Sequence, residues 1–429
     1  MIDDRTIYLD NNATTAVAPE VLEAMLPFLT TEYFNPSSVY ERAKPAAQAV
    51  RQARETVAAF LGGAALEEVL FTSCATESVN AAMYGAMRAN PERRHLVTTA
   101  VEHPAVYEVA KDLARGGLEV DFLPVDHAGR CDPRSLARAL RPGETLLVAV
   151  MHANNETGVI FPVADLARLT KETDPSILFL TDATQTAGKV PLDLNGTLRE
   201  VDLLAFSGHK LYAPKGVGVL FARRGARLRP FLVGGHQESG RRAGTENVPY
   251  IAGLARACRL AQEDHGAVET RIRRLRDRLE TGLRAAIPFV EVNGEGAERL
   301  PNTLNLSAHF IEGEGMLYEL NDHGICASSG SACTSGSLEP SHVLRAMRVP
   351  FTAMHGSIRF SLGRYNTEAE IERVIGVFPG IVDALRRLSP YWDPAQNRPR
   401  PEAEAMMHAP PDIAGWIPSG RAVGPPPRF

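Results

Sequence analysis

The chain has 429 residues, of which 44% are hydrophobic and 23% are charged. This composition is typical of globular proteins, and the length is sufficient for a large core divided into two domains. The 51 acidic and 46 basic residues are mixed along the sequence and give a formal charge of -5. Such a pattern excludes a basic surface for nucleic acid or anionic lipid, and it favours a small substrate or a protein partner.

The sequence shows no signals for export, membrane insertion or disulfide formation. The stretch MIDDRTIYLD lacks the basic and apolar regions of a secretory signal, and no apolar run reaches the length of a membrane span. The five cysteines form an odd set without CxxC spacing, which argues against a disulfide framework and a zinc site. We therefore expect a reducing, cytoplasmic setting.

Apolar, β-rich runs alternate with helical stretches between about Ala16 and Cys258. The runs include HLVTTA, TLLVAVM, ILFLTDA, LLAFS and GVGVLFA, and one of the helical stretches is PAAQAVRQARETVAAFL. This alternation predicts an α/β fold with a mainly parallel sheet flanked by helices.

The alternation of apolar runs and helical stretches ends at about Arg259. A long charged helix, TRIRRLRDRLETGLRAA, is followed by the short strands TLNLS and SIRFSL and by a helix starting near Thr367, which predicts a smaller α+β domain beyond a boundary near Asp264. From Ser389 the chain is rich in proline and ends in GPPPRF. Because proline disfavours helix interiors and inner strands, we expect a surface-draped or disordered tail there.

The first candidate site in chain order is the segment FTSCATESVNAAMYGAM, where a strand end passes into a helix. The free N–H groups and the dipole at a helix start suit a phosphate, with Ala75 and Thr76 as contacts. The alternative is that Thr76 or Ser73 merely caps the helix.

Two further polar residues follow strand ends. His103 in VEHPAV can enter the crevice, stack on a flat ring and shuttle protons, although a lone histidine is more often a structural hydrogen-bonding group. Asn155 in MHANNETG can contact a ring oxygen or a substrate carboxylate, although it is also typical of a turn.

Asp182 ends the strand in ILFLTDATQTAGK and is expected to point into the crevice, where it can pair with a pyridinium nitrogen. Gln185 can donate to the ring oxygen of a cofactor, or it can cap the following turn. In the next segment, SGHK, a desolvated Lys210 can bond to an aldehyde cofactor, with Ser207 and neighbouring donors holding a phosphate. The alternative for SGHK is an ordinary surface turn.

Three later segments complete the candidate site. GGHQESGRRAGTENVP, with Thr245, predicts an irregular loop that approaches a phosphate or a second subunit. ASSGSACTSGS predicts a mobile, exposed loop on which Cys333 is a nucleophile that visits both substrate and acceptor, or else an accidental thiol liable to oxidation. Arg359 in SIRFSLGR can grip a substrate carboxylate bidentately, or form a surface salt bridge.

Taken together, these segments resemble the NifS-type cysteine desulfurases. The resemblance extends to about Trp392 and rests on the segments YLDNNATT, TSCATES, EHPAV, ANNETG, DATQTAGK, SGHK, GTEN, SSGSACTSG and SIRFSLGRYNT. It implies a homodimer of the fold-type I PLP-dependent transferases, in the class V aminotransferase family. The implied units are a large PLP-binding domain (16–263) with a mainly parallel seven-stranded sheet flanked by helices, a smaller α+β domain (1–15 and 264–392) that carries the cysteine loop, and a proline-rich tail (393–429).

The resemblance also implies a role for each candidate residue. Lys210 would form the Schiff base with pyridoxal 5'-phosphate, Asp182 would pair with the pyridine nitrogen, and His103 would be the stacking imidazole and a catalytic group. The other implied contacts are Gln185 and Asn155 at the ring oxygen or substrate, Ala75, Thr76, Ser207 and His209 at the phosphate, Thr245 at the phosphate of the opposite subunit, Arg359 at the substrate carboxylate, and Cys333 as sulfur acceptor.

The implied activity is removal of sulfur from L-cysteine, which yields L-alanine and a persulfide on Cys333. An iron-sulfur scaffold protein would take this sulfur, with Cys333 as a transient iron-sulfur ligand. SSGSACTSG resembles the long-loop branch, and RRAGTENVPYI and TSGSLEPSHVLRAM resemble its nitrogen-fixation form, which implies nitrogenase maturation. Alternatives are a housekeeping desulfurase, a selenocysteine lyase, another class V aminotransferase or lyase, and a non-enzymatic sulfur carrier. Cys74 departs from the family, which usually has glycine there, and its side chain can constrain the turn.

Overall fold

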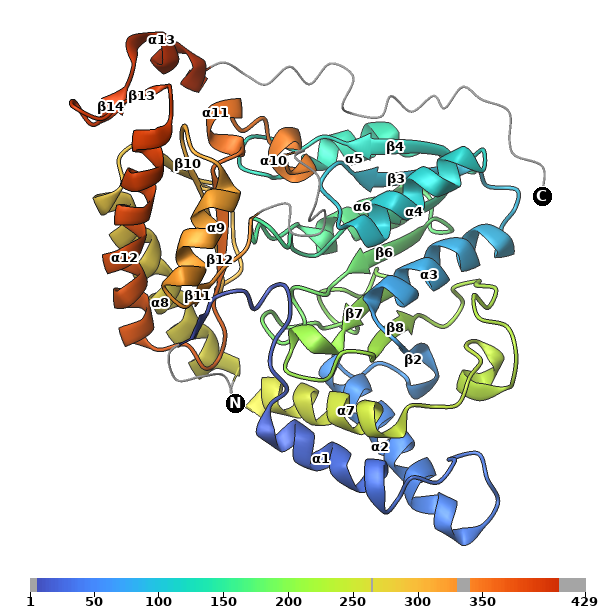
Figure 1. Cartoon of the computed structure of the whole chain (residues 1–429). Coiled ribbons are helices and arrows are strands. Elements are labelled where there is room, and N and C mark those ends of the chain that lie inside the picture. Colours follow the sequence, from blue (N-terminus) through green and yellow to red (C-terminus); the bar gives the residue numbers. More distant parts are fainter. Residues whose placement is uncertain (1–5, 264, 330–339, 409–429) are drawn as a thin grey trace.

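The computed structural model describes residues 6–263, 265–329 and 340–408. Its centre is a seven-stranded sheet with the order β2-β8-β7-β6-β5-β3-β4 (Figure 1). The strands are β2 (Val69–Thr72), β3 (His95–Thr99), β4 (Glu119–Leu123), β5 (Thr145–Ala149), β6 (Leu178–Asp182), β7 (Leu203–Ser207) and β8 (Gly218–Ala222). Only β8 runs antiparallel to its neighbours, so the predicted mainly parallel sheet is confirmed.

Helices cover both faces of this sheet, which explains why its strands are continuous apolar runs. Successive side chains of a strand face opposite sides, and in β7 Leu204 and Phe206 join one apolar cluster while Leu203 and Ala205 join the other. The second cluster lies under α3 (Ala75–Ala89) and α4 (Pro104–Arg115). The first cluster lies under α1 (Pro19–Thr30), α2 (Lys44–Phe60), α5 (Pro133–Ala139), α6 (Val163–Thr173) and α7 (Val248–Glu263).

A smaller α+β unit surrounds an antiparallel sheet of order β12-β10-β9. Its elements are α8 (His265–Ala286), β9 (Val290–Val292), β10 (Thr303–Ala308), α9 (Gly313–Asp322), β11 (Ile325–Cys326), β12 (Ser357–Ser361) and α12 (Glu368–Leu388). The N-terminal strand β1 (Ile7–Tyr8) joins this unit by pairing in parallel with β11. Thr367 and Glu370 form a capping box at the start of α12, so the predicted helix start near Thr367 is confirmed.

Two short helices beyond residue 264 pack on the large sheet. They are α10 (His342–Ala346) and α11 (Phe351–Met354). Their buried side chains, such as Leu344 and Met354, belong to the apolar cluster that contains α1, α2 and α7. The division into residues 16–263 and 264–392 is still a proposal, and these two helices lie across it.

Of the two expectations for the tail, surface-draped or disordered, the structure contradicts disorder for residues 393–408. β13 (Trp392–Asp393) pairs with β14 (Arg398–Pro399), and α13 (Pro401–Glu404) and the 3-10 helix η6 (Ala405–His408) follow. Pro399 is tolerated in this two-stranded hairpin, and Pro401 opens a helix, where no N–H is needed. Trp392 anchors the segment because it is buried against Phe310 and below the guanidinium of Arg386. Residues 409–429 lie outside the described part of the chain.

The two longest described helices, α8 and α12, are rich in charged residues. Within the ranges that the structure describes, no helix combines the length and the apolarity needed to cross a bilayer.

Candidate active site

A cleft with about 1150 Å³ of empty space, part of it open to solvent, lies at the carboxyl edge of the large sheet. Parallel strands end at the same edge, so the polar residues that follow them are brought together there. The predicted residues that line the cleft are Ala75, Thr76, His103, Asn155, Asp182, Gln185, Ser207, His209, Lys210 and Arg359. Asn12, Ala13, Cys74, Ala105, Met151, Ala153 and Thr184 also line it.

Lys210 stands at the end of the 3-10 turn η3 (Gly208–Lys210), directly after β7. Its Nζ donates to the backbone oxygens of Asn12 and Ala13, at 2.5 Å each. The predicted strand-end lysine therefore reaches across the cleft to the N-terminal segment. Its charge also affects Lys189, because burial and the positive charge of Lys210 together lower the pKa of Lys189 to about 7.

Asp182 and Gln185 lie on the β6 side of the cleft. Asp182 is buried, and its Oδ1 accepts the backbone N–H of Thr184 at 2.9 Å. Gln185 does not cap the following turn, because its Nε2 donates to the backbone oxygen of Asn12 at 3.1 Å. Its Oε1 is buried without a partner among the described residues. Since an amide nitrogen carries two hydrogens, the predicted donation to a ring oxygen is still available.

His103 caps α4 and also lines the cleft. It is therefore both a structural hydrogen-bonding group and a residue of the candidate site. Its Nδ1 accepts the backbone N–H of Ala105 at 3.1 Å, and the neutral ring therefore carries its proton on Nε2. Burial lowers the pKa of His103, and the negative charge of Asp182 partly opposes that effect.

The predicted phosphate end is formed where β7 meets the start of α3. Ser207 Oγ accepts the backbone N–H of Ala75 at 2.7 Å. His209 contacts Thr14 through Nδ1 at 3.1 Å, and burial, with the charge of Lys210, lowers its pKa to about 4. The helix cap is Cys74, without a side-chain bond, so the alternative role of Thr76 or Ser73 as cap is wrong.

Cys74 does not strain the turn that it occupies. Its φ of -174° and ψ of 171° are extended values that any residue adopts. The crowded position is Gly218, whose backbone lies close to that of Cys74. A Cβ at Gly218 would lie 2.7 Å from the backbone of Cys74. Glycine is therefore required at position 218 and not at position 74.

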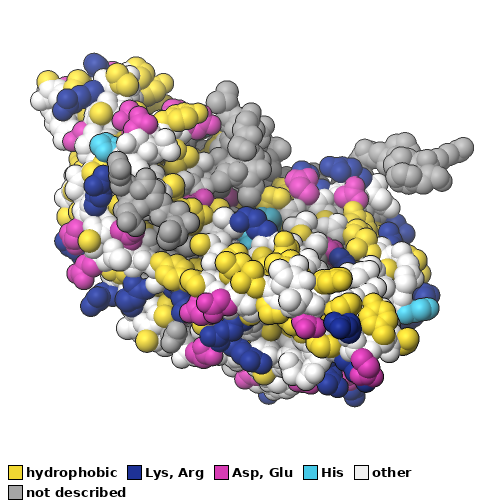
Figure 2. Space-filling model, turned by 60° about the horizontal axis from the view of Figure 1, so that its bottom comes forward, with side chains coloured by type: hydrophobic (Ala, Val, Ile, Leu, Met, Phe, Trp, Pro, Cys, Tyr) yellow, Lys and Arg dark blue, Asp and Glu magenta, His cyan; other side chains and the backbone are white. Residues whose placement is uncertain are grey.

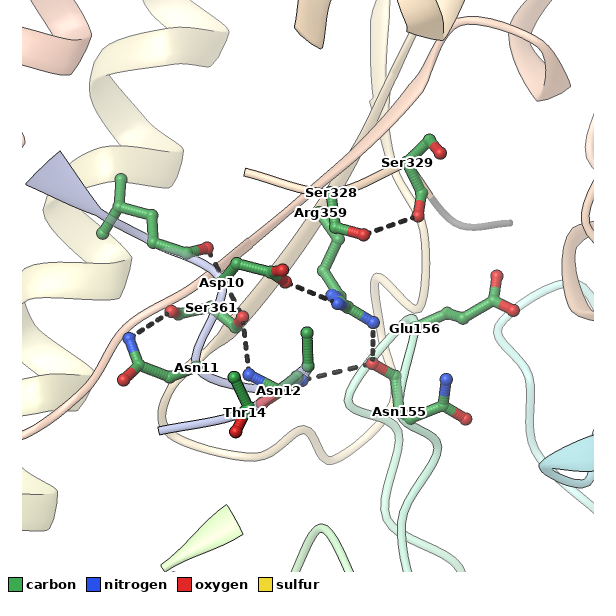
Figure 3. Close-up of polar contacts among 12 residues, drawn as sticks. Asp10, Asn11, Asn12, Thr14, Asn155, Glu156, Ser328, Ser329, Arg359 and Ser361 are labelled. Atoms are coloured by element: carbon green, nitrogen blue, oxygen red, sulfur yellow. Dashed lines mark hydrogen bonds and ion pairs between the residues drawn. The ribbon is translucent and has the colours of Figure 1, made fainter. Parts of the chain in front are cut away.

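Arg359, on β12, closes the cleft from the smaller unit (Figure 3). Its Nη2 donates to Asp10 Oδ1 at 2.7 Å, and its Nη1 donates to the backbone oxygen of Asn155 at 3.0 Å. Arg359 is only 4% exposed, so the alternative of a surface salt bridge is wrong. Its Nε is buried and has no partner in the described part of the chain.

Asn12 was not assigned a role from the sequence, yet it connects both sides of the site. It is 1% exposed, and its backbone oxygen accepts from both Lys210 and Gln185. Its remaining partners are Ser361 at 2.9 Å, Thr303 at 2.9 Å, Asn302 at 3.0 Å and the backbone oxygen of Asn155 at 3.2 Å. The available signal was a polar Asp-Asn-Asn run directly after an apolar strand in YLDNNATT.

Two predicted residues are not part of the cleft as described. Thr245 is exposed in the loop between η4 (Gln237–Gly240) and α7 and does not line the cleft. Cys333 lies in the range 330–339, outside the described residues. The chain that leads to this range runs beside the cleft, because Ser328 pairs with Arg359 through two backbone hydrogen bonds of 3.2 and 2.6 Å.

Comparison with known proteins identifies the family of this chain. The sequence profile of the family described as Aminotransferase class-V matches residues 7–374. Cysteine desulfurase 1 of Trichormus variabilis is 54% identical over 405 residues, which cover 94% of this chain and 99% of that protein. Cysteine desulfurase NifS of Azotobacter vinelandii is 52% identical over 386 residues, 90% of this chain and 95% of that protein.

The fold is likewise shared with solved structures. A NifS-like protein superposes with a TM-score of 0.83 at 38% identity, covering 89% of this chain and all of that one. A structure described as SspA in complex with cysteine superposes with a TM-score of 0.74 at 32% identity, covering 84% of this chain and all of that one. The chain belongs to the class V aminotransferase family and, within it, to the cysteine desulfurases, enzymes that depend on pyridoxal 5'-phosphate.

Proposed function

We propose that the cleft is where this chain takes sulfur from L-cysteine, with Lys210, Asp182 and His103 as the groups around the cofactor and Cys333 as the sulfur acceptor. The observation that carries this assignment is the convergence of Lys210, Asp182, His103 and Arg359 on one cleft. No other lysine in the described part of the chain lines it.

The residues of the cleft fit the cofactor. Bound pyridoxal 5'-phosphate supplies an aldehyde that bonds to amines and a cationic ring that accepts electrons from carbon. Lys210 offers the amine, and the buried carboxylate of Asp182 can keep a proton on the ring nitrogen. The amide oxygen of Gln185 has no hydrogen-bond partner among the described residues. It is therefore an acceptor that a bound group can use. Ser207, His209 and the start of α3, with Ala75 and Thr76, form the phosphate end.

The protein groups account for the remaining steps. Arg359, which lines the cleft, binds the carboxylate of L-cysteine, and Asn155 lies beside it. Nζ of Lys210 removes the α-proton, and His103 assists the other proton transfers. The thiolate of Cys333 then attacks the substrate sulfur. An S–S bond forms as the C–S bond breaks. The C–S electron pair stays on carbon and takes up the proton that the Cys333 thiol lost, and Nζ of Lys210 returns the α-proton. L-cysteine and the Cys333 thiol thus give L-alanine and a Cys333 persulfide.

The decisive experiment measures alanine and sulfide released from L-cysteine with a thiol reductant, while the visible spectrum records the cofactor. Wild-type protein is expected to give equimolar products and a yellow cofactor band, and Cys333→Ala is expected to lose turnover. Cys326→Ala is the matched control, because Cys326 is a free cysteine that does not line the cleft. Full turnover by Cys333→Ala would support another class V lyase or aminotransferase. A colourless, inactive wild type after cofactor addition would support a sulfur carrier.

The proposed assembly is a homodimer. Leu22, Leu26 and Leu29 are about half-exposed on one face of α1, and Figure 2 shows hydrophobic side chains gathered on the face where α1 lies. Apolar patches of this kind are typical of protein interfaces. Thr245 is exposed and away from the cleft of its own chain, which fits a contact to the phosphate of the opposite subunit.

A mixed dimer tests this contact. When Lys210→Ala and Thr245→Ala subunits are combined, a Thr245 that acts across the interface leaves one site with both residues intact and about half of the wild-type activity. If Thr245 acts within its own chain, neither site has both residues, and the mixed dimer is no more active than the Thr245→Ala homodimer. A monomer in sedimentation would contradict the assembly itself.

The proposed destination of the sulfur is an iron-sulfur scaffold protein that serves nitrogenase. The similarity to the cysteine desulfurase NifS of Azotobacter vinelandii supports this destination. A strain without this chain is expected to lose nitrogenase activity while its other iron-sulfur enzymes keep theirs. An equal loss of both would support a housekeeping role instead.

A further inference from the structure

Glu156 binds the helix that follows the segment carrying Cys333. The Oγ of Ser341 caps α10 by accepting the backbone N–H groups of Val343 and Leu344, at 3.1 and 3.2 Å. The same Oγ lies 2.6 Å from Oε2 of the buried Glu156. Since a serine hydroxyl has one hydrogen, and both backbone groups donate to its oxygen, that hydrogen is given to Glu156.

The next residue provides a second attachment. Nε2 of His342 donates to the backbone oxygen of Glu102 at 2.9 Å, and the ring packs on Tyr107 with 5.0 Å between centroids. Glu102 directly precedes His103 in the chain. Because the apolar side chains of α10 also join the cluster of the large sheet, the start of α10 is fixed next to the cleft.

The turn that contains Glu156 also holds Arg359. The backbone oxygen of Asn155 accepts from Arg359, while the side chain of Glu156 accepts from Ser341. The turn itself is rigid, because Asn154 Oδ1 accepts the N–H groups of Glu156 and Thr157 at 2.9 Å each. Adjacent residues of one turn therefore fix the proposed substrate-carboxylate ligand and α10.

The chain that precedes Cys333 is attached to Arg359, which bonds to the same turn. Ser328 pairs with the backbone of Arg359, and Figure 3 shows Ser328, Arg359, Asn155 and Glu156 close together. Cys333 lies four positions after Ser329 and seven before Pro340, which an extended chain spans in at most about 14 and 25 Å. The described residues on both sides of this segment are therefore attached beside Arg359 and Glu156.

We propose that Glu156 is a positioning residue for sulfur transfer: through Ser341 it fixes the chain that follows Cys333 to the turn that holds Arg359. This inference rests on the proposed role of Cys333 as sulfur acceptor. It assigns to Glu156 no contact with the substrate or the cofactor.

The experiment separates substrate binding from sulfur transfer. Binding of L-cysteine is titrated through the cofactor band in a Cys333→Ala background, and transfer is measured as persulfide on Cys333 in a single turnover by mass spectrometry. Glu156→Ala is expected to slow persulfide formation about 10- to 100-fold, because a small misplacement of a reacting group has that effect. Its Kd for L-cysteine is expected to stay within about twofold of the parent value.

Variants of Glu156 and Ser341 test whether Glu156 acts through its hydrogen bond with Ser341. Glu156→Gln keeps an oxygen that accepts from Ser341 and is expected to slow transfer about fivefold or less. Ser341→Ala is expected to resemble Glu156→Ala, and the double variant to be no slower than either single variant. Glu68→Ala is the control for the loss of a buried glutamate, because Glu68 bonds to Ala65 and Arg224 and does not line the cleft.

A readout that needs no turnover is hydrogen exchange in the cofactor-loaded protein without substrate. Residues 341–346 are expected to exchange faster in Glu156→Ala and at the parent rate in Glu156→Gln. Unchanged persulfide formation in Glu156→Ala, or an equal loss of binding and transfer, overturns the proposal. A wild type that forms no persulfide on Cys333 contradicts the proposed function itself, and it also contradicts the proposed role of Glu156.

Discussion

The two sides of the cleft are built in different ways. On the sheet side, Lys210, Asp182 and His103 each follow a strand of the large sheet, so the strands alone bring them together. On the opposite side, Arg359 and Asn12 are held by hydrogen bonds between distant parts of the chain. The sheet side thus depends on backbone architecture buried under two layers of helices, whereas the opposite side depends on a polar network in which each group needs its partner.

This difference predicts opposite consequences of substitution. A change on the sheet side should remove chemistry and leave the fold intact, because the strands do not depend on the polar side chains at their ends. A change in the network should cost stability as well as substrate binding, because it leaves buried polar groups without partners.

Lys210→Ala is expected to have the largest effect. Turnover of L-cysteine should fall by about 10²- to 10⁴-fold or more, because the amine proposed to remove the α-proton is lost. The free energy of unfolding should fall by only about 1 kcal/mol, through the loss of the hydrogen bonds to Asn12 and Ala13. The exposed Lys215, five positions along the chain, provides the matched control Lys215→Ala. A large loss of stability in Lys210→Ala would contradict the separation of chemistry from fold on the sheet side.

Asp10→Ala tests the network side. The change leaves the guanidinium of Arg359 buried without its carboxylate partner, so the free energy of unfolding should fall by about 3 kcal/mol. The KM for L-cysteine should rise as well. Urea unfolding measures the first effect and initial rates the second. Asp10→Asn keeps an acceptor oxygen and should cost less, and a stability equal to wild type in Asp10→Ala would show that the ion pair does not hold Arg359.

Glu102 allows a test by pH. Burial raises the pKa of Glu102 from 4.5 to about 8, opposed by hydrogen bonds from Thr99 and Met151. Because the folded pKa lies above the unfolded one, folding favours the protonated form, and this stabilisation is complete below pH 4.5 and lost as the pH rises through about 8. Glu102→Gln resembles the protonated form at every pH.

The unfolding free energy of Glu102→Gln relative to wild type should therefore increase by about 2 kcal/mol between pH 6 and pH 8. Denaturant titrations across this range measure the difference, which cancels the titration of all other groups. A difference that is constant with pH would show that the carboxyl titrates in its ordinary range.

Cys74→Gly should have the smallest effect. Because Cys74 has an extended backbone conformation, glycine brings no relief of strain and only adds freedom to the unfolded chain, at a cost of about 1 kcal/mol or less. The Kd for pyridoxal 5'-phosphate should change by less than about twofold. A cofactor affinity that rises several-fold would show that the thiol obstructs the phosphate end.

The same contrast explains what the sequence predicted. The strands, the long helices and the strand-end residues carry local signals, since an apolar run ends in a polar residue that must then lie at the sheet edge. The Asp-Asn-Asn run marks a strand end in the same way, but it does not identify the partners of Asn12, such as Thr303 and Ser361, because they are remote in sequence. The short hairpin and helix of residues 393–408 lack such a local signal, because proline disfavours helix interiors and inner strands, whereas Pro399 and Pro401 occupy positions that tolerate proline.

The hydrogen bonds between the N-terminal segment and β12 have a consequence for synthesis. Asn11 bonds to Ser361 across 350 positions of sequence, so the N-terminal residues leave the ribosome long before their partners are translated. The large sheet can form first, because its strands lie between residues 69 and 222. A nascent or truncated chain that lacks β12 therefore has the strand-end lysine but no completed wall opposite it. Such a chain also lacks Arg359, the proposed ligand of the substrate carboxylate, because Arg359 lies on β12.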